Sequence, residues 1–258
     1  MQLSFLQIFP IKSLDAVEIR EARVMPGGSL QHDREFSLFD TAGKWVRGKR
    51  EVKLHQIRSK FDLAARTVEL KAPGCETKTF HLDAERSGIE KWIGAFFGYA
   101  VALRQDLQHG FPDDGELHGP TVLAAASIER VGAWFPGMPV SDVRRRFRAN
   151  LEVSGAPAFW EDQFYKSADG ATRSIRIGDV VLNGGAPCDR CVVVTRDPDT
   201  GVGRSGFEKE FMAHRAAEVP AWAQRSAMEH FFMFSLRTTV QPGEAGKVLR
   251  IGDPVSAI

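Results

Sequence analysis

Residues 173–197, RSIRIGDVVLNGGAPCDRCVVVTRD, contain the pattern that decides the fold class. Short runs of apolar and β-branched residues lie between glycine, proline and aspartate, which predicts strands joined by turns. The first 80 residues have the same rhythm, because LSFLQIFPI, AVEIREARV and REFSLFD alternate with turn residues such as MPGG. We therefore expect a fold made mainly of strands.

Three helices are expected between these strands. Asp83 can cap the first, in which apolar residues recur at helical spacing as far as Gly98. Ser127 can cap a short second helix that ends before Pro136, and residues 207–219 have a helical pattern as well. Because helices do not alternate regularly with strands, a mainly β, barrel-like or sandwich fold is favoured over a doubly wound α/β sheet.

The segment 105–120, QDLQHGFPDDGELHGP, is polar and rich in Gly, Pro and Asp. Such a segment predicts a domain boundary or a long functional loop. We expect a first β-rich domain over residues 1–105 and a second over residues 106–258.

Composition limits the partners and the compartment. A formal net charge of +1 provides no global field for nucleic acid, so no nucleic-acid partner is expected. No run of about 18 uncharged apolar residues is present, which argues against a membrane span. Three cysteines, Cys75, Cys188 and Cys191, are too few for a disulfide scaffold and indicate a reducing, cytoplasmic location.

The pair Cys188 and Cys191 is the most informative feature for chemistry. We expect Cys191 to enter a β-branched strand, whereas a thioredoxin-type pair opens a helix, so a dithiol oxidoreductase is disfavoured. Cys75 has no neighbouring Cys or His to complete a zinc site. Two packed core cysteines remain an alternative, but Asp189 and Arg190 between the thiols favour an exposed turn with a thiolate, a ligand for a soft metal.

The motif DPDTG at residues 197–201 is typical of a turn, because proline fixes φ and glycine accepts a left-handed conformation. Asp197 could face a metal or substrate as a proton carrier, although a structural turn aspartate is the favoured interpretation.

Two cationic clusters could bind an anion. On a strand over residues 143–153, the side chains of Arg144, Arg146, Arg148 and Asn150 would share one face. A solvated surface or a weak nucleic-acid patch is an equally plausible interpretation of that run. The second cluster contains Lys12, Ser13 and Arg34 near the ends of early strands, where they could hold a phosphate, and no dinucleotide or Walker motif is present.

Taken in order, these motifs resemble one family. The early FPIKS, a DREF strand, FRAN, CDRC followed by DPDTG, and a final IGDPV resemble the MOSC (molybdenum-cofactor-sulfurase C-terminal) layout. That layout comprises an N-terminal β-barrel domain and a MOSC β-barrel domain, and the resemblance covers nearly the whole chain. Members with this two-domain layout include amidoxime-reducing proteins and bacterial proteins that detoxify N-hydroxylated bases. Ala149 stands where many members have proline, which would loosen the strand slightly.

The resemblance implies a molybdenum cofactor (Mo-molybdopterin) whose metal is held by the pterin dithiolene and by Cys191; pyridoxal phosphate is not expected. It implies that the cofactor phosphate and pterin are bound by the residues that match the family motifs, which are Lys12, Ser13, Arg34, Arg148 and Asn150. To these we add Arg146 from the cationic run, and Cys188 and Arg190, which are close to the metal ligand in the sequence.

The activity that the resemblance implies is two-electron reduction of a small N-hydroxylated compound to its N–H form. Electrons are expected from a separate donor protein of ferredoxin, flavin reductase or cytochrome type, because the chain ends just after IGDPV without an iron–sulfur domain. His118 is a candidate proton donor in the loop, although loop histidines are more often only solvated. A cofactor carrier and a sulfur-transfer protein are the alternatives.

Overall fold

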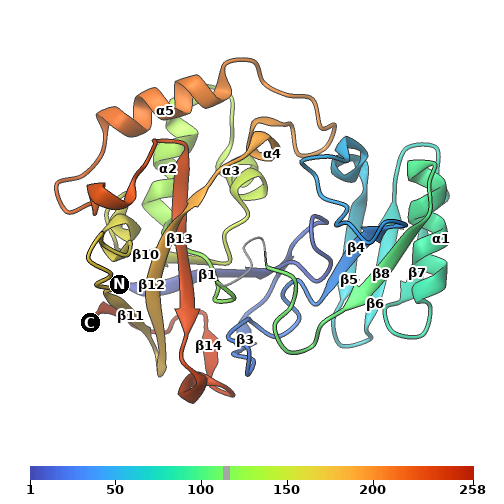
Figure 1. Cartoon of the computed structure of the whole chain (residues 1–258), viewed down its shortest axis with the longest axis horizontal. Helices are drawn as coiled ribbons and strands as arrows, with labels where there is room; N and C mark the ends of the chain where they lie inside the picture. Colours follow the sequence, from blue (N-terminus) through green and yellow to red (C-terminus); the bar gives the residue numbers. More distant parts are fainter. Residues whose placement is uncertain (113–116) are drawn as a thin grey trace.

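The computed structural model describes residues 1–112 and 117–258, and it contains a large strand-rich unit beside a smaller one (Figure 1). The large unit is an eight-stranded sheet in the order β15-β11-β12-β13-β9-β10-β1-β2. Its strands are β1 Gln2–Ile8, β2 Val17–Glu18, β9 Val122–Ala124, β10 Leu151–Ser154, β11 Ser174–Ile177, β12 Val180–Asp189, β13 Met233–Val240 and β15 Val255–Ala257.

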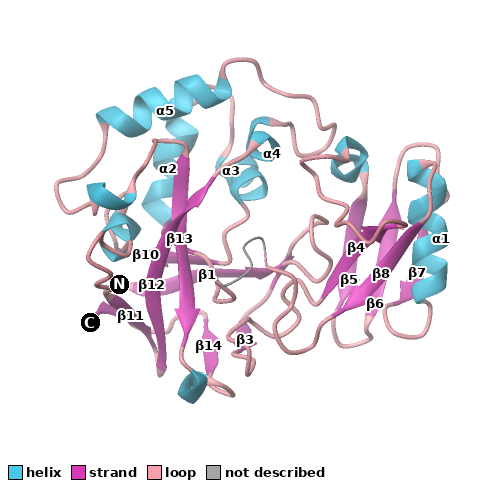
Figure 2. Ribbon diagram, viewed as in Figure 1, coloured by secondary structure: helices cyan, strands magenta, loops and turns pink. Residues whose placement is uncertain are grey.

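The smaller unit consists of a two-stranded and a three-stranded sheet, with helix α1 along its outer edge (Figure 2). Its elements are β4 Phe36–Asp40, η1 Val52–Gln56, β5 Arg58–Asp62, β6 Thr67–Lys71, β7 Lys78–His81, α1 Arg86–Phe97 and β8 Val101–Gln105. The strands β3 Glu21–Arg23 and β14 Val248–Arg250 pair separately.

The remaining helices gather at one end of the large sheet, at the top of Figure 2. They are α2 Ala125–Trp134, α3 Val140–Phe147, α4 Val192–Thr195 and α5 Phe207–Ala217, with short 3-10 turns η2 Trp160–Phe164, η3 Arg225–Ala227 and η4 Pro242–Glu244 elsewhere. Among the residues the structure describes, no helix has the length and apolar composition needed to cross a bilayer.

The expected mainly β fold with a few helices is confirmed. The two ends of the large sheet approach each other, because Gln2 bridges Pro254 and the N–H of Leu3 donates to the carbonyl of Asp253 at 2.9 Å. Both termini therefore lie close together (Figure 1). In the described ranges, however, the strand ladders do not close into a continuous barrel.

The first strand packs with the second half of the chain. β1 pairs antiparallel with β10, and Leu3 and Leu6 are buried in the same core as Val122 and Leu236. A separate core fills the smaller unit, with Phe36 among its buried residues. The predicted boundary at residue 105 stays a prediction, but β1 pairs within the large sheet and Ala22 of β3 is buried in the same core.

The expected strand over residues 143–153 is wrong in its first half. Residues 140–147 form α3, which buries Val143, Arg146 and Phe147 on one side, and β10 begins only at Leu151. The apolar pair Val143 and Phe147 has the i,i+4 spacing that buries one helix face. The predicted strand face of Arg144, Arg146, Arg148 and Asn150 therefore does not exist.

The expected strand CVVVTRD is also wrong. β12 ends at Asp189, and α4 then forms one helical turn with Cys191 at its N-cap position. The guanidinium of Arg146 donates to the carbonyl of Val194 at 3.2 Å and to that of Arg196, which stabilises this turn despite its β-branched residues. Because Cys191 does open a helix, the argument against a dithiol pair that rested on a strand no longer holds.

Both predicted helix caps are wrong, although all three helices are present. Glu85 is the N-cap of α1, and Asp83 binds Arg66 instead. Ser127 lies within the first turn of α2, where its hydroxyl donates to Glu161 at 3.0 Å. Gly98 does end α1 in the left-handed conformation, as glycine commonly does.

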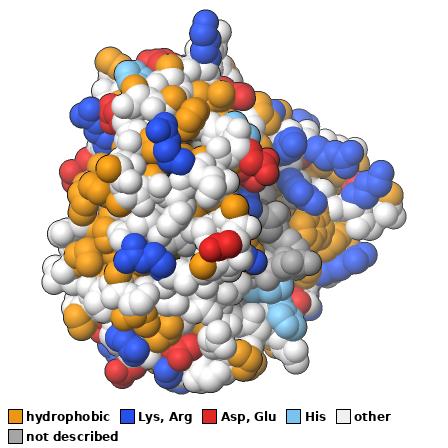
Figure 3. Space-filling view, turned by 60° about the vertical axis from the view of Figure 1, so that its left-hand side comes forward, with side chains coloured by type: hydrophobic (Ala, Val, Ile, Leu, Met, Phe, Trp, Pro, Cys, Tyr) orange, Lys and Arg blue, Asp and Glu red, His pale blue; other side chains and the backbone are white. Residues whose placement is uncertain are grey.

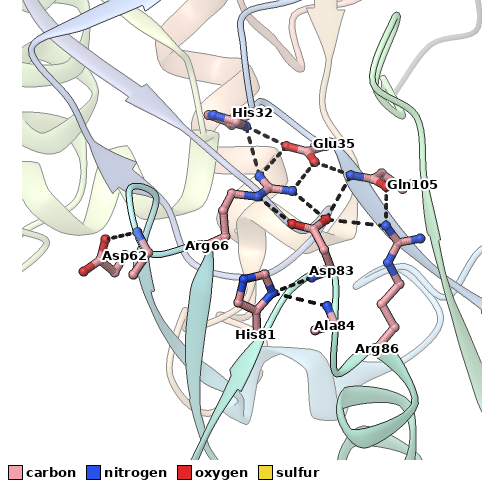
Figure 4. Close-up of polar contacts among 10 residues, drawn as sticks. His32, Glu35, Asp62, Arg66, His81, Asp83, Ala84, Arg86 and Gln105 are labelled. Atoms are coloured by element: carbon pink, nitrogen blue, oxygen red, sulfur yellow. Dashed lines mark hydrogen bonds and ion pairs between the residues drawn. The ribbon is translucent and has the colours of Figure 1, made fainter.

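A buried ionic network fixes the chain just before β4 (Figure 4). Glu35, 3% exposed, accepts hydrogen bonds from Arg66 at 2.6 and 2.9 Å and from Gln105 at 2.5 Å, and its carboxylate lies 2.6 Å from His32. Burial alone would raise the pKa of Glu35, but these hydrogen bonds and the charge of Arg66 outweigh it and lower the pKa to about 2. The network holds Arg34, its chain neighbour, in place.

Glu35→Gln should lower the free energy of unfolding at pH 7 by about 3 kcal/mol, because it removes the buried ionic partner of Arg66, leaving only Asp83, while keeping the side-chain shape. A carboxyl whose pKa is depressed stabilises the fold above its unfolded pKa and stops doing so as the pH falls through its folded pKa. Denaturant unfolding between pH 5 and pH 2 should therefore show a steeper loss for the wild type than for the variant. Parallel pH profiles would contradict this assignment.

Candidate functional site

A cavity of about 470 Å³ lies where the smaller unit meets the helices and the end of β12. Nine of the eleven predicted site residues line it, although they come from segments far apart in the sequence. These residues are Lys12, Ser13, Arg34, His118, Arg146, Arg148, Cys188, Arg190 and Cys191. Asn150 and Asp197 are not among the lining residues.

The two cysteines lie at the junction of β12 and α4. Cys188 is buried at the end of the strand, Cys191 is half-buried at the N-cap of α4, and both are free thiols. Between them, Arg190 donates to the carbonyl of Phe147 at 3.0 Å and also to Phe234 and Ser235 of β13. The arginine thus ties the CDRC segment to α3 and β13 and fixes Cys191 at the cavity wall.

Three of the residues expected to grip a phosphate have left-handed backbone conformations. Ser13, Arg34 and Arg148 have φ values of 71°, 51° and 54°. Such conformations are costly for residues other than glycine and tend to cluster at functional sites. The conformation of Arg148 also ends α3, where its N–H donates to the carbonyl of Arg144 at 2.8 Å.

The cations at this end of the cavity are held by backbone carbonyls, by the rings of Phe9 and Trp45, and by the carboxylate of Asp33, which binds Arg34. The guanidinium groups of Arg148 and Arg34 lie 4.0 and 5.0 Å from the ring centre of Phe9. Arg148 donates to the carbonyl of Leu14 at 2.8 Å. The ammonium of Lys12 donates to the carbonyls at positions 111 and 112, at 3.1 and 2.6 Å. These contacts orient the cations before any ligand binds.

Asn150 supports the cavity wall from behind and is fully buried. Its Oδ1 accepts from the N–H and the hydroxyl of Thr121, both at 3.1 Å, and lies 3.4 Å from Nη1 of Arg34. Its Nδ2 donates to the carbonyl of Gln7 at 3.1 Å. Asn150 is therefore placed to position Arg34.

Asp197 is occupied by its own turn. Its Oδ1 accepts from the N–H groups of Asp199 and Thr200 and from the Thr200 hydroxyl, at 2.8 to 3.1 Å. Burial would raise its pKa, but the hydrogen bonds to Thr200 and Asp199 lower it. The geometry matches the structural-turn interpretation, and a catalytic role for Asp197 stays a prediction without support from its position.

The cavity is strongly cationic. Among its described lining residues are twelve lysine and arginine side chains and three aspartates. Several are paired, because Arg144 binds Glu152 at 2.7 Å while Arg58 and Arg145 both bind Asp199. Figure 3 shows one group of Lys and Arg side chains at the right of the face it draws, with others scattered over the rest of that face. The remaining positive charge favours an anionic ligand.

His55, Arg58, Arg196 and Arg237 line the cavity but were not predicted from sequence. His55 is half-buried, and burial followed by the charges of Arg196, Arg148 and Arg58 lowers its pKa to about 4. It is therefore neutral near pH 7. In the sequence, the basic run GKWVRGKREVK just before His55 was the feature that could have pointed to this part of the cavity wall.

His118 lies on the cavity wall with its ring centre 5.2 Å from that of His109. Its Nδ1 is buried and has no hydrogen-bond partner within residues 1–112 and 117–258. Position 116, in the same loop, lies outside the described residues. Nowhere in these two ranges do three or more His, Cys, Asp or Glu side chains form a metal-binding cluster.

Comparison with known proteins places both halves of the chain. A family model described as the MOSC N-terminal beta barrel domain matches residues 1–100, and one described as the MOSC domain matches residues 118–256. A human protein named molybdenum cofactor sulfurase is 24% identical over 244 residues, covering 76% of this chain and 26% of that protein. Human mitochondrial amidoxime-reducing component 1 is 25% identical over 236 residues, covering 76% of this chain and 66% of that protein.

The chain thus spans about a quarter of the length of the human sulfurase and about two thirds of the amidoxime-reducing component. The YUAD protein from Bacillus subtilis superposes over 99% of this chain and 94% of its own, with a TM-score of 0.39 and 11% identity.

Replacing Arg148 should separate stability from anion binding. The free energy of unfolding of Arg148→Gly should be about 1 kcal/mol higher than that of Arg148→Ala, because only glycine adopts the left-handed conformation at the helix end without a steric cost. Both variants lose the guanidinium, so the dissociation constant for inorganic phosphate should rise roughly tenfold in each. Denaturant unfolding and calorimetric titration measure the two effects, and equal stability of the two variants would contradict the first.

Proposed function

The chain belongs to the MOSC family, and from this premise we propose that it binds a molybdenum cofactor in the cationic cavity and reduces small N-hydroxylated compounds. The observation that carries the proposal is the meeting of one half-buried thiol, Cys191, with the cations Lys12, Arg34 and Arg148 on the wall of a single cavity. The names of the relatives, which mention the molybdenum cofactor and amidoxime reduction, support the same ligand and reaction class.

The residues present fit such a cofactor. A phosphorylated pterin needs charge-assisted donors for its phosphate, and Lys12, Arg34 and Arg148 supply ammonium and guanidinium groups already oriented by Phe9 and backbone carbonyls. A soft metal needs a thiolate, and Cys191 offers one at the cavity wall. When bound, the cofactor supplies the two-electron redox chemistry.

The protein's own residues then bind and orient the substrate and deliver protons. The overall change breaks one N–O bond and forms one N–H bond, so R–NHOH with two electrons and two protons gives R–NH2 and water. His118 lines the same cavity as Cys191 and can carry one of these protons. His55, which is neutral at pH 7, can accept a hydrogen bond from an N–H or O–H of the substrate without adding a charge.

A cofactor carrier or a sulfur-transfer protein is the second candidate. The presence of Cys188 beside Cys191 and the relatives named as sulfurases favour it. Full molybdenum loading without dye-driven reduction of a hydroxylamine would support this candidate over the reductase.

Cys191→Ala should reduce the molybdenum content of protein purified from a cofactor-competent host to roughly a tenth or less, because it removes the thiolate ligand. Cys188→Ala is the matched control and should retain most of the metal. Metal analysis together with fluorescence of the released pterin measures both. Full loading of Cys191→Ala would rule out the ligand assignment.

His118→Gln should lower kcat for dye-driven hydroxylamine reduction by about 10²-fold with little change in KM, because general acid catalysis contributes about that much. It should also remove one limb of the pH–rate profile. His81→Gln, on β7 outside the cavity, is the control. An unchanged kcat and pH profile for His118→Gln would assign the proton transfer to another group.

A further inference from the structure

A loop of four exposed cations borders the cavity from the smaller unit. Lys44, Arg47, Lys49 and Arg50 are all exposed and lie within seven consecutive positions. In the described part of the chain, no Asp or Glu carboxylate lies within ion-pair distance of any of them. The loop therefore presents positive charge to solvent that no ion pair among the described residues neutralises. By contrast, Arg58 and Arg145, which line the cavity, both form ion pairs with Asp199.

These cations surround a shallow hollow of about 580 Å³ beside Trp45. The indole lies between two cations, with the ammonium of Lys12 at 4.1 Å and the guanidinium of Arg47 at 4.4 Å from its ring. Arg47 and Lys49 also line the main cavity, so the hollow and the cavity lie on either side of the same residues.

The same loop packs directly against the helix that follows the thiol. A Cβ added at Gly48 would lie 3.5 Å from a side-chain methyl of Val193, and the carbonyl of Gly48 accepts a hydrogen bond from Arg196. Val192, which follows Cys191 in the chain, is 41% exposed. An exposed residue of the helix that packs against this loop is therefore the direct chain neighbour of Cys191.

Exposed apolar side chains lie beside the cations. Val202, in the turn after α4, is 68% exposed, and Val52, at the start of η1, is 38% exposed. The 201 and 52 positions are in close contact, since a Cβ at Gly201 would lie 2.6 Å from a Val52 methyl. We call the surface formed by Lys44, Arg47, Lys49, Arg50, Val52, Val192 and Val202 the basic rim.

We propose that the basic rim is the docking surface for a small acidic electron-donor protein that delivers electrons to the centre at Cys191. The inference rests on the proposed function, which consumes two electrons for each N–O bond reduced. Each docked donor gives up one electron, so two reduced donors are consumed for each N–O bond broken. Two protons come from solvent, and the products are the N–H compound and water.

The composition of the rim suits a transient redox complex. Weak electron-transfer encounters bury small interfaces, and charge complementarity there steers association and sets its rate more than its final affinity. A few exposed apolar side chains within a charged border match the anatomy of such interfaces. The whole chain has a net charge of only +1. The positive charge of the basic rim is therefore a local feature, which suits a small protein partner better than a long nucleic acid.

The test uses the double variant Lys44→Glu with Arg50→Glu, because these two residues line the hollow but not the main cavity. The control is Lys60→Glu with Lys91→Glu, which makes the same charge change at exposed positions on β5 and α1. The probes are an acidic [2Fe–2S] ferredoxin and an acidic b-type cytochrome, with holoprotein as the binding partner.

We expect the rim variant to bind the better of the two probes roughly tenfold more weakly at low salt, with the difference vanishing at high salt. The control variant should bind like the wild type. In turnover supported by the donor protein, the KM of the rim variant for the donor should rise by the same factor as its dissociation constant. Turnover driven by a small reduced dye should stay unchanged in both the rim variant and the control variant.

Equal binding of donor by the rim variant and the wild type would overturn the proposal, as would failure of both probes to bind the wild type at low salt. Tighter binding of a single-stranded oligonucleotide than of either probe, lost in the rim variant, would also overturn it in favour of nucleic acid. Absence of dye-driven turnover in wild-type holoprotein would instead refute the proposed reductase function, and the binding comparison would still decide the docking surface.

Discussion

Reciprocal hydrogen bonds between Gln7 and Asn150 hold the two walls of the site together. The N–H of Gln7 donates to the carbonyl of Asn150 at 2.9 Å, the Asn150 amide donates back to the carbonyl of Gln7 at 3.1 Å, and the Gln7 amide donates to the carbonyl of Ala149. These residues are 143 positions apart and fully or nearly fully buried. Because Lys12 lies shortly after the end of β1 and Arg148 shortly before the start of β10, this pairing brings the early and late cations to one cavity.

The cavity concentrates both positive charge and backbone strain. Arginine residues at positive φ and a lysine that is only 2% exposed would be unfavourable in isolation. Here Phe9, backbone carbonyls and the Glu35 network hold these residues in position. An anionic ligand would offset the mutual repulsion of these charges. Preorganisation of this kind reduces the ordering that binding requires, which is how a rigid site gains affinity.

The sequence predicted which residues gather at the site better than it predicted their local structure. Cys191, Lys12, Arg34 and Arg148 were chosen from residue type and motif order, and all four line the cavity. The helices α3 and α4 were both predicted as strands, because β-branched residues and alternating arginines resemble a strand pattern over a few residues. Packing overrides such weak local preferences: Phe147 and Val143 are buried together with the aromatic core beneath α5.

By itself, the sequence determined the strand-rich class, the three longer helices near their observed places, and the residue types that can bind a soft metal and a phosphate. It could not determine which residues meet, because a pairing such as that of Gln7 with Asn150 depends on contacts across more than half of the chain. Only the tertiary structure put Asn150 behind Arg34 and added His55 and the basic loop to the cavity wall. The physical reason is that local propensity acts over a few residues, whereas burial and hydrogen-bond satisfaction are settled by the whole fold.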